Sequence, residues 1–417
     1  MSLHTPGRRL GFFALVLLLV SFYVGSCAKV FYASHLGLSE RTSDLKHAVQ
    51  LQPRNARYHF LLANNEFVVE SDPVATVREL KVATGLDPHT SGYWLALARA
   101  ELVEGDLAGQ QNAIEQALRV DPTTPDVAWE AANFYVVRGE LHPALRCLRT
   151  VIENDPEAAP RAVALAWRAS GSAATAMAEA LPAQTEAYGA LLHQAMLAND
   201  RVAADLVWAH AYALRQAIPV MIANEYIGWL LDSKRVTEAR QVWRQLLERD
   251  EILKGYGTGD DLVVNGGFEK ELLNGGFDWR IQPTPSVKVD LDNVHFHEGH
   301  QALAVAFDAN YVANIGVVQP IPVQPDTMYA FRAFVRSEDL ESAIGPKFVV
   351  DDAFSHARLG MSQEISGSGP WDERAFDFKT GPQTSLVVIS VVRDPSNTLI
   401  RGKLWIDDVS ITRKKTN

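Results

Sequence analysis

The chain has 417 residues, 47% of them hydrophobic and 21% charged, which is ordinary for folded protein with room for two or three domains. Its formal net charge of −11 argues against a nucleic-acid partner, because phosphate binding requires a basic surface. The two cysteines, Cys27 and Cys147, provide neither a disulfide framework nor metal-ligand spacing.

An apolar segment at residues 10–33 predicts a membrane anchor. Leu10 to Ala28 alone reaches about the ~20 residues that cross a bilayer. Two arginines precede the segment and a single lysine lies near its end, so residues 1–9 are predicted to be cytoplasmic. The sequence thus predicts a single-pass protein of the cell membrane, with the bulk of the chain extracytoplasmic, in the periplasm.

Two alternatives exist for the same segment. Val24-Gly25-Ser26-Cys27 resembles a bacterial lipoprotein cleavage box, which would make Cys27 the lipidated N-terminus. A plainly cleaved signal peptide is the other alternative. All three interpretations place the folded part on the far side of the membrane.

A period of about 34 residues follows the apolar segment. Pro53, Pro88, Pro122 and Pro156 each close a short phrase such as Leu86-Asp87-Pro88. Between the prolines, small and large apolar residues share one helical face, and a proline ends the second helix of each pair. This pattern resembles tetratricopeptide repeats, whose stacked helix pairs form an all-α solenoid.

The predicted array spans residues 39–250, with a clear period to residue 156 and degenerate repeats after it. A helix around Leu45 and Ala48 precedes the first full repeat, and its partner is expected to be the end of the membrane segment. Later helix pairs are expected at 162–169 with 173–180, 186–198 with 202–214, and 219–231 with 235–248. Solenoids of this kind dock peptides or proteins, so we expect a protein partner here. Most tryptophans of the array are expected in its core.

A change of composition marks a second domain. Residues 251–261 are rich in glycine and charge and are predicted to be a linker. Short alternating runs then predict an all-β sandwich or jelly roll at residues 262–413. The expected strands are 286–291, 302–307, 328–335, 375–378, 385–392 and 403–411.

Several separated phrases of this domain carry a family resemblance. The opening phrase Leu262 to Glu269, the phrase around Trp279, and the closing phrase Leu404 to Ile411 occur in the order seen in jelly-roll carbohydrate-binding modules of the galactose-binding-like superfamily. The resemblance implies a structural Ca²⁺ held by Glu269 and by Asp407 or Asp408, with backbone oxygens assisting. The alternative is that these carboxylates are solvated or cap loops.

The resemblance also implies polysaccharide as a ligand. Tyr311 is a candidate sugar-binding residue in an expected loop, and Phe354 with His356 form a second candidate. Trp279, Trp371 and Trp405 lie on framework phrases and are expected in the core.

The sequence indicates no catalytic site. His295, His297 and His300 cluster, but no acidic or cysteine partner has diagnostic spacing, so we expect them at the surface. A glycosidase pair built on Asp351-Asp352 and Glu364 is disfavoured, because the domain matches a binding fold.

These patterns predict a non-enzymatic, membrane-anchored scaffold that binds protein partners through its repeats. By analogy with other anchored repeat proteins, its setting would be bacterial exopolysaccharide or cell-envelope assembly. The alternative is a glycan-binding protein in which the sandwich is the active part.

Overall fold

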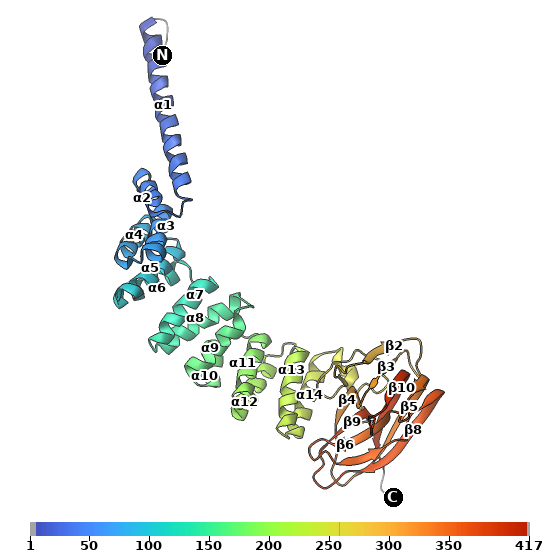
Figure 1. Ribbon diagram of the computed structural model, residues 1–417. Helices are drawn as coiled ribbons and strands as arrows, with labels where there is room; N and C mark the ends of the chain where they lie inside the picture. The colour runs from blue at the N-terminus through green and yellow to red at the C-terminus, as the bar shows by residue number, and fades with distance from the viewer. Residues whose placement is uncertain (1–5, 258, 415–417) are drawn as a thin grey trace. The chain divides into compact units, whose positions relative to one another are not determined.

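The structure is a computed structural model that describes residues 6–257 and 259–414 (Figure 1). Residues 1–5 of the predicted cytoplasmic segment lie outside the described residues. The chain divides into two compact units, Met1–Pro182 and Ala183–Asn417, and each is described here by itself.

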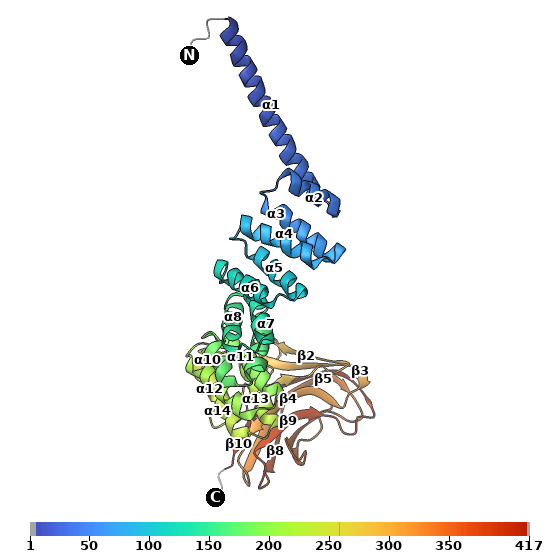
Figure 2. The same cartoon turned by 90° about the vertical axis from the view of Figure 1, so that its left-hand side faces the viewer.

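The first unit begins with a long apolar helix, α1 (Pro6–Leu36). An 18-residue window within Arg9–Leu36 has a mean hydropathy of 2.3, so by length and composition α1 is able to cross a membrane. In both views it extends well beyond the helices that follow it (Figures 1 and 2). Its C-terminal turn is different, because Ala33 and Leu36 are buried in a cluster with Ala48 and Tyr58. The end of α1 therefore covers the first helices of the array, as the sequence predicts.

Helical hairpins make up the rest of the first unit, which confirms the predicted all-α repeats. Its helices are α2 (Thr42–Leu51), α3 (Ala56–Asn65), a π-helical turn η1 (Glu66–Glu70), α4 (Pro73–Leu86), α5 (Ser91–Glu104), α6 (Leu107–Val120), α7 (Pro125–Val137), α8 (Leu141–Asn154), α9 (Ala159–Ser170) and α10 (Ala173–Glu179). Asp72 and Asp106 cap α4 and α6 by accepting backbone N–H groups. Gly105 ends α5 in a left-handed conformation, which glycine adopts at little cost.

Small residues set the spacing between the helices. Ala63, Ala83, Ala98 and Ala117 are buried at positions that recur with the repeat. Large aliphatic residues such as Leu80 fill the space beside them. Alanines allow two helix backbones to approach closely, and stacking of neighbouring pairs then buries the apolar faces that one pair leaves exposed.

The second unit contains two further helix pairs and the sandwich. The helices are α11 (Thr185–Leu197), α12 (Arg201–Ala213), α13 (Val220–Asp232) and α14 (Val236–Arg249). Trp208 and Trp243 are buried among them, as expected of core residues. Their ends agree closely with the helix pairs expected from the sequence.

Two five-stranded antiparallel sheets form the sandwich, which confirms the predicted all-β domain. One sheet has the order β2-β3-β10-β5-β8 and the other β1-β4-β9-β6-β7. The strands are β1 (Arg280–Ile281), β2 (Val287–Asp292), β3 (Ala302–Tyr311), β4 (Asn314–Pro322), β5 (Met328–Glu341), β6 (Lys347–Asp352), β7 (Arg358–Met361), β8 (Gly367–Lys379), β9 (Leu386–Val392) and β10 (Leu399–Arg413). The six expected strands correspond to β2, β3, β5, β8, β9 and β10. The sequence did not indicate β1, β4, β6 and β7.

The segment between the helices and the sandwich is packed. Leu253 and Tyr256 are buried in a short 3-10 turn, η2 (Leu253–Tyr256), and the Tyr256 hydroxyl donates to the backbone oxygen of Glu271 at 2.7 Å. Within this unit, Trp243 of α14 also contacts Phe277 edge to face. The glycine and charge content predicts a linker at residues 251–261, but the buried side chains of Leu253 and Tyr256 hold part of this segment in place.

Candidate functional sites

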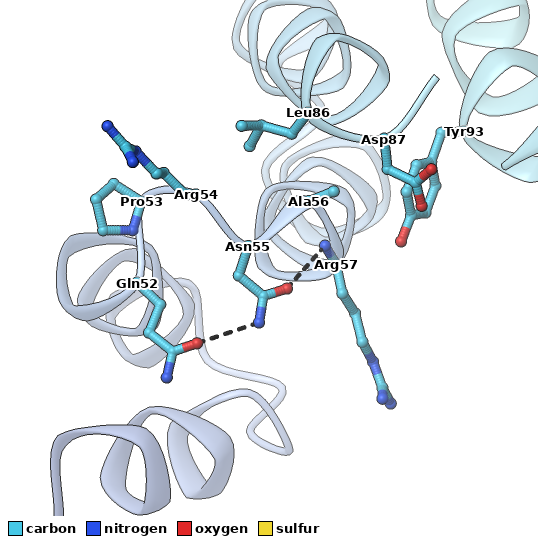
Figure 3. A pocket seen from close by; sticks show the side chains of 9 residues that line it. All are labelled: Gln52, Pro53, Arg54, Asn55, Ala56, Arg57, Leu86, Asp87 and Tyr93. Carbon is cyan, nitrogen blue, oxygen red and sulfur yellow. Dashed lines mark hydrogen bonds between the residues drawn. The ribbon is translucent and has the colours of Figure 1, made fainter. Parts of the chain in front are cut away.

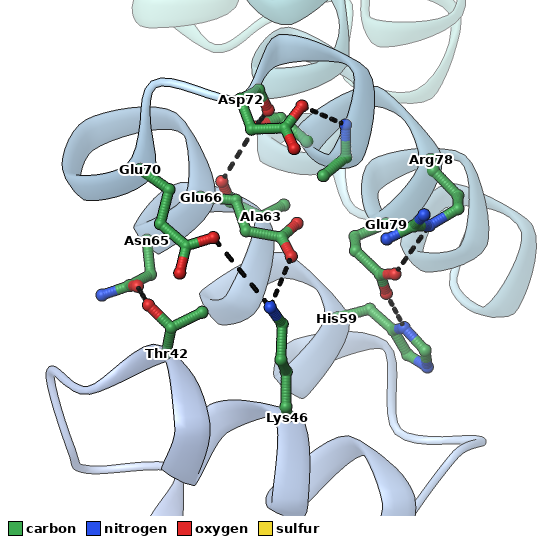
Figure 4. A network of polar contacts seen from close by, with 12 residues as sticks. Thr42, Lys46, His59, Ala63, Asn65, Glu66, Glu70, Asp72, Arg78 and Glu79 are labelled. Carbon is green, nitrogen blue, oxygen red and sulfur yellow. Dashed lines mark hydrogen bonds and ion pairs between the residues drawn. The ribbon is translucent and has the colours of Figure 1, made fainter.

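A solvent-exposed lysine paired with a buried glutamate recurs in two successive repeats. Lys46 of α2 lies 3.9 Å from Glu66, and Lys81 of α4 lies 3.2 Å from Glu101 (Figure 4 shows the first pair). Each member is 35 residues from its counterpart, so the pair follows the repeat. Glu66 and Glu101 are only 1% and 2% exposed, whereas both lysines reach solvent.

These pairs join the second helix of one repeat to the first helix of the next. Burial raises the pKa of Glu66 and of Glu101, and one carboxylate oxygen of each has no hydrogen-bond partner. An ion pair with a solvated lysine offsets only part of the cost of burying a charge. The pairs therefore favour a particular register between repeats more than they favour stability.

Replacing Glu101 with glutamine should stabilise this part of the array by roughly 1 kcal/mol at pH 8. A raised carboxyl pKa means that ionisation costs stability in the folded state, so the advantage of E101Q should shrink as the pH falls towards 5. Hydrogen exchange of α5 amides at both pH values measures this effect. E115Q, at an exposed position of α6, is the matched control. A variant that is less stable than wild type at both pH values would contradict the expectation.

A surface hollow lies where the first two proline-closed loops meet (Figure 3). It has a volume of about 680 Å³ and is lined by residues of 52–57 together with Leu86, Asp87 and Tyr93. Asn55 caps α3 by accepting the N–H of Arg57 and donates to Gln52. Arg54 and Arg57 are exposed beside it. Asn55 therefore serves the start of α3.

Exposed apolar residues recur at the turns between the two helices of successive repeats. Val68, Val103 and Val137 are 76%, 59% and 88% exposed and are 35 and 34 residues apart. Leu102 and Leu107 extend the patch at the middle turn. Scattered apolar residues are ordinary on a surface, but this set follows the repeat period, and we call it the apolar turn edge.

The sandwich carries an acidic corner where β10 meets the opening loop of the domain. Asp407 is fully buried there. Its Oδ2 accepts the backbone N–H groups of His297 and Glu298 at 2.7 and 3.3 Å, and its Oδ1 accepts that of Asp408 at 2.8 Å. Burial raises the pKa of Asp407 to about 6. This carboxylate therefore holds the loop before β3 onto strand β10.

The predicted calcium residues meet at this corner. A Cβ on Gly267 would lie within 4 Å of atoms of Asp408, Glu269 and Asp407, so three acidic side chains surround one glycine. Oε1 of Glu269 accepts the N–H groups of His300 and Gln301. The charge of the set fits a hard cation such as Ca²⁺. The hydrogen bonds also fit the alternative, in which the carboxylates fasten loops, so the calcium site stays a prediction.

The structure brings His297 into the same corner. Its Nδ1 lies 2.6 Å from Oδ2 of Asp408, and its ring stacks on Phe334 at 3.8 Å with 10° between the planes. His297 is thus half-buried beside an acid 111 residues away. His295 is half-buried as well, with its Nδ1 3.0 Å from Asp292, so the expectation of three surface histidines was wrong for these two. His300 is exposed, as expected. Sequence spacing alone gave no signal for this long-range pair.

Two of the three framework tryptophans lie outside the core between the sheets. Trp279 belongs to that core, as expected, and its indole N–H donates to Asn265. Trp405 is also buried, at 2% exposed, but on the outer face of the sheet, where its indole N–H donates to Asp292 and Arg336 lies over its ring. Trp371 of β8 is half-buried on the same outer face and contacts His297. The expectation of buried tryptophans is thus confirmed for Trp279 and Trp405 and was wrong for Trp371, whose half-buried ring makes the outer face partly aromatic.

The three candidate sugar-binding residues do not form one site. Tyr311 is exposed at the end of β3, paired with Leu399, so it lies in a strand and not in a loop. Phe354 is half-buried in the turn after β6, with the Lys234 ammonium 5.5 Å from its ring centre. His356 is exposed with a left-handed backbone. Their role in ligand binding stays a prediction.

Comparisons with known proteins found similarities only among solved structures, all at low TM-scores. No protein-family model and no curated protein sequence matches the chain. Among solved structures, a CBM4 module (12% identity, TM-score 0.29) matches over 36% of this chain and 99% of its own. TmCBM61, solved with β-1,4-galactotriose (19%, 0.26), matches over 37% and 99%. YrrB, a TPR protein with an unusual peptide-binding site (15%, 0.29), matches over 42% and 93%.

Each of these structures corresponds to one part of the chain, and at such TM-scores we take no functional argument from them. The helical repeats and the β-sandwich rest on the elements described above.

Proposed function

We propose that this protein is a membrane-anchored extracytoplasmic adaptor whose helical repeats dock a protein partner. The observation that carries the proposal is the junction between α1 and the array. The buried end of α1 covers Ala48 and Tyr58, and a Cβ at Gly37 would lie 2.7 Å from the Tyr58 ring. An anchor that also completes the first repeat would be retained with the folded chain. The setting we propose is bacterial envelope or exopolysaccharide assembly.

The mass of the mature N-terminus tests the anchor. We expect an intact chain that stays in the membrane fraction after a carbonate wash. Cleavage before Cys27 with an added lipid would leave Ala33 and Leu36 in place and would support the lipoprotein alternative. Cleavage beyond residue 36 would remove both buried side chains and would overturn the anchored form of the proposal.

We propose the apolar turn edge as the docking surface for the protein partner. Its residues are too exposed to contribute to the core of the repeat, and their burial by a partner would be favourable at about 25 cal/mol per Å². Their fixed spacing along the array suits an apolar segment that spans several repeats.

Photo-crosslinking in the source membranes tests this surface. A crosslinking amino acid placed at position 68, 103 or 137 should capture the same protein from all three positions. Positions 115 and 153, exposed on the second helices of two repeats, are the controls. Capture that is equal at control and edge positions, or absent from the edge, would refute the docking surface.

A second candidate, glycan binding, is favoured by the aromatic outer face of the sandwich. The half-buried Trp371 lies on β8 two residues before Glu373 of the Arg332–Glu373 ion pair, so a stacking surface and polar groups share this face. Retention of the chain in polysaccharide affinity gels, and its loss in W371A, would support this function. Tyr311 is distant in the sheet order, so Y311A serves as the comparison for the predicted loop site.

A further inference from the structure

We propose that His297, Glu298 and Asp408 bind a divalent transition-metal ion of the zinc class. One ligand atom from each of the three residues lies within 4.8 Å of the other two. In the part of the chain that the structure describes, no other group of three such side chains converges in this way. The inference concerns a site that neither the docking nor the glycan proposal requires.

The three side chains come from two segments that the fold holds together. His297 and Glu298 lie in the connection from β2 to β3, and Asp408 lies on β10. They border a hollow of about 400 Å³ whose other walls include Gly266, Gly267 and Phe334. The side chains of His297 and Asp408 keep about a quarter of their surface exposed, so an ion has access from solvent.

The imidazole is held in place before any ion arrives. Phe334 stacks on one face of the ring at 3.8 Å, and the Trp371 ring approaches its edge with 5.8 Å between ring centres. The backbone N–H groups of His297 and Glu298 both donate to the buried Asp407. Fixed ligands of this kind reduce the ordering cost of binding, and the buried carboxylate behind them orients the segment that bears two ligands.

The donor set indicates which cation fits. One imidazole nitrogen with two carboxylate oxygens suits Zn²⁺ or a similar ion, and three protein ligands leave a position for water. Ca²⁺ prefers an all-oxygen set of six to eight ligands. The nearby guanidinium of Arg332 is paired with Glu373 at 2.5 Å, and the contact of 2.6 Å between Nδ1 of His297 and Oδ2 of Asp408 is the one that an ion would replace. The site is therefore distinct from the calcium set, of which it shares only Asp408.

Titration of the metal-free, detergent-solubilised full chain with ZnCl₂ tests the proposal. We expect one tight site per chain by calorimetry, weakened at least tenfold in H297A and in D408N. H300A is the matched control, because the exposed His300 ring lies outside the group, and it should bind as wild type does. Bound Co²⁺ should show the visible bands of a site with one histidine ligand.

Several outcomes would overturn the proposal. Equal loss of binding in H297A and H300A would show that zinc binds the surface histidines without a defined site. Loss of zinc binding in E269Q with H297A unaffected would place the cation in the oxygen-only set. Full competition by equimolar CaCl₂ would do the same. Circular dichroism of each metal-free variant establishes that it is folded, and two variants with different ligands removed guard against a folding defect in one.

Discussion

Replacing Asp407 with alanine should destabilise the sandwich by about 3 kcal/mol in metal-free buffer. The variant leaves three backbone N–H groups, of residues 297, 298 and 408, without their acceptor. Each unpaired buried donor costs about 1–3 kcal/mol, and water that enters the loosened corner recovers part of this. The connection before β3 should therefore exchange its amide hydrogens much faster, while the helical repeats of the first unit stay unchanged.

Two further variants distinguish the loss of the hydrogen-bond acceptor in D407A from the loss of a negative charge at this corner. D407N keeps one acceptor oxygen and removes a buried charge whose ionisation is already costly, so it should lose less than half as much stability as D407A. D408A removes a more exposed side chain that is paired with His297, and its cost should stay below about 1 kcal/mol. Hydrogen exchange of residues 293–303 measures all three variants. If D407A and D408A cost the same, Asp407 does not have the role of holding the loop.

The helical half could be predicted closely because its signal is local and repeated. The phrases ending in Pro53, Pro88, Pro122 and Pro156 fix where helices end, since each proline lacks the N–H that a helix needs. The repeated alanines fix which faces meet. Even the partner of α2 could be assigned, because Leu45 and Ala48 need a covering helix and the membrane segment is the one available.

The sandwich was predicted less completely because sheet contacts are not local. Strand β4 contains two prolines, and β6 is a short apolar run, so neither has the alternation that indicates a half-exposed strand. Alternation also leaves open which face of a strand turns to the second sheet. For this reason the sequence did not show that Trp405 is buried on the outer face of its sheet, while Leu404 and Ile406 beside it enter the core between the sheets.

The acidic corner illustrates the same limit. The family resemblance implied that Glu269 and Asp407 or Asp408 are Ca²⁺ ligands, and the fold does gather these three side chains around Gly267. The histidine that approaches Asp408 lies 111 residues earlier in the chain, and no pattern in sequence links the two. The apolar turn edge was missed for another reason: its valines look like ordinary helix residues until their exposure is known.

The stability of the second unit should decrease between pH 5 and pH 8, in part because of Asp278. This side chain is fully buried, its Oδ2 accepts the N–H of Leu273 at 2.7 Å, and its Oδ1 has no partner. Burial raises the pKa of Asp278 from 3.8 to about 6. A raised carboxyl pKa means that stability is fully present below the unfolded value and is lost as the pH rises through 6. The free energy of unfolding should fall by about 3 kcal/mol in all because Asp278 ionises, and roughly half of this loss falls between pH 5 and pH 8.

Substituting asparagine at position 278 should remove this contribution and flatten the pH profile. The variant keeps an oxygen for Leu273 but cannot ionise, so at pH 8 it should be more stable than wild type and at pH 4 about equal to it. Any pH dependence of stability that remains in D278N comes from the other buried carboxyls, Asp407 among them. The contribution of Asp278 is therefore read from the difference between the wild-type and D278N profiles. Exchange of the Leu273 amide, corrected for its intrinsic pH dependence, reports the effect at the residue that Asp278 binds. A D278N profile as steep as that of wild type would contradict this expectation. It would mean that Asp278 is ionised in the folded protein, which would require a cation beside it.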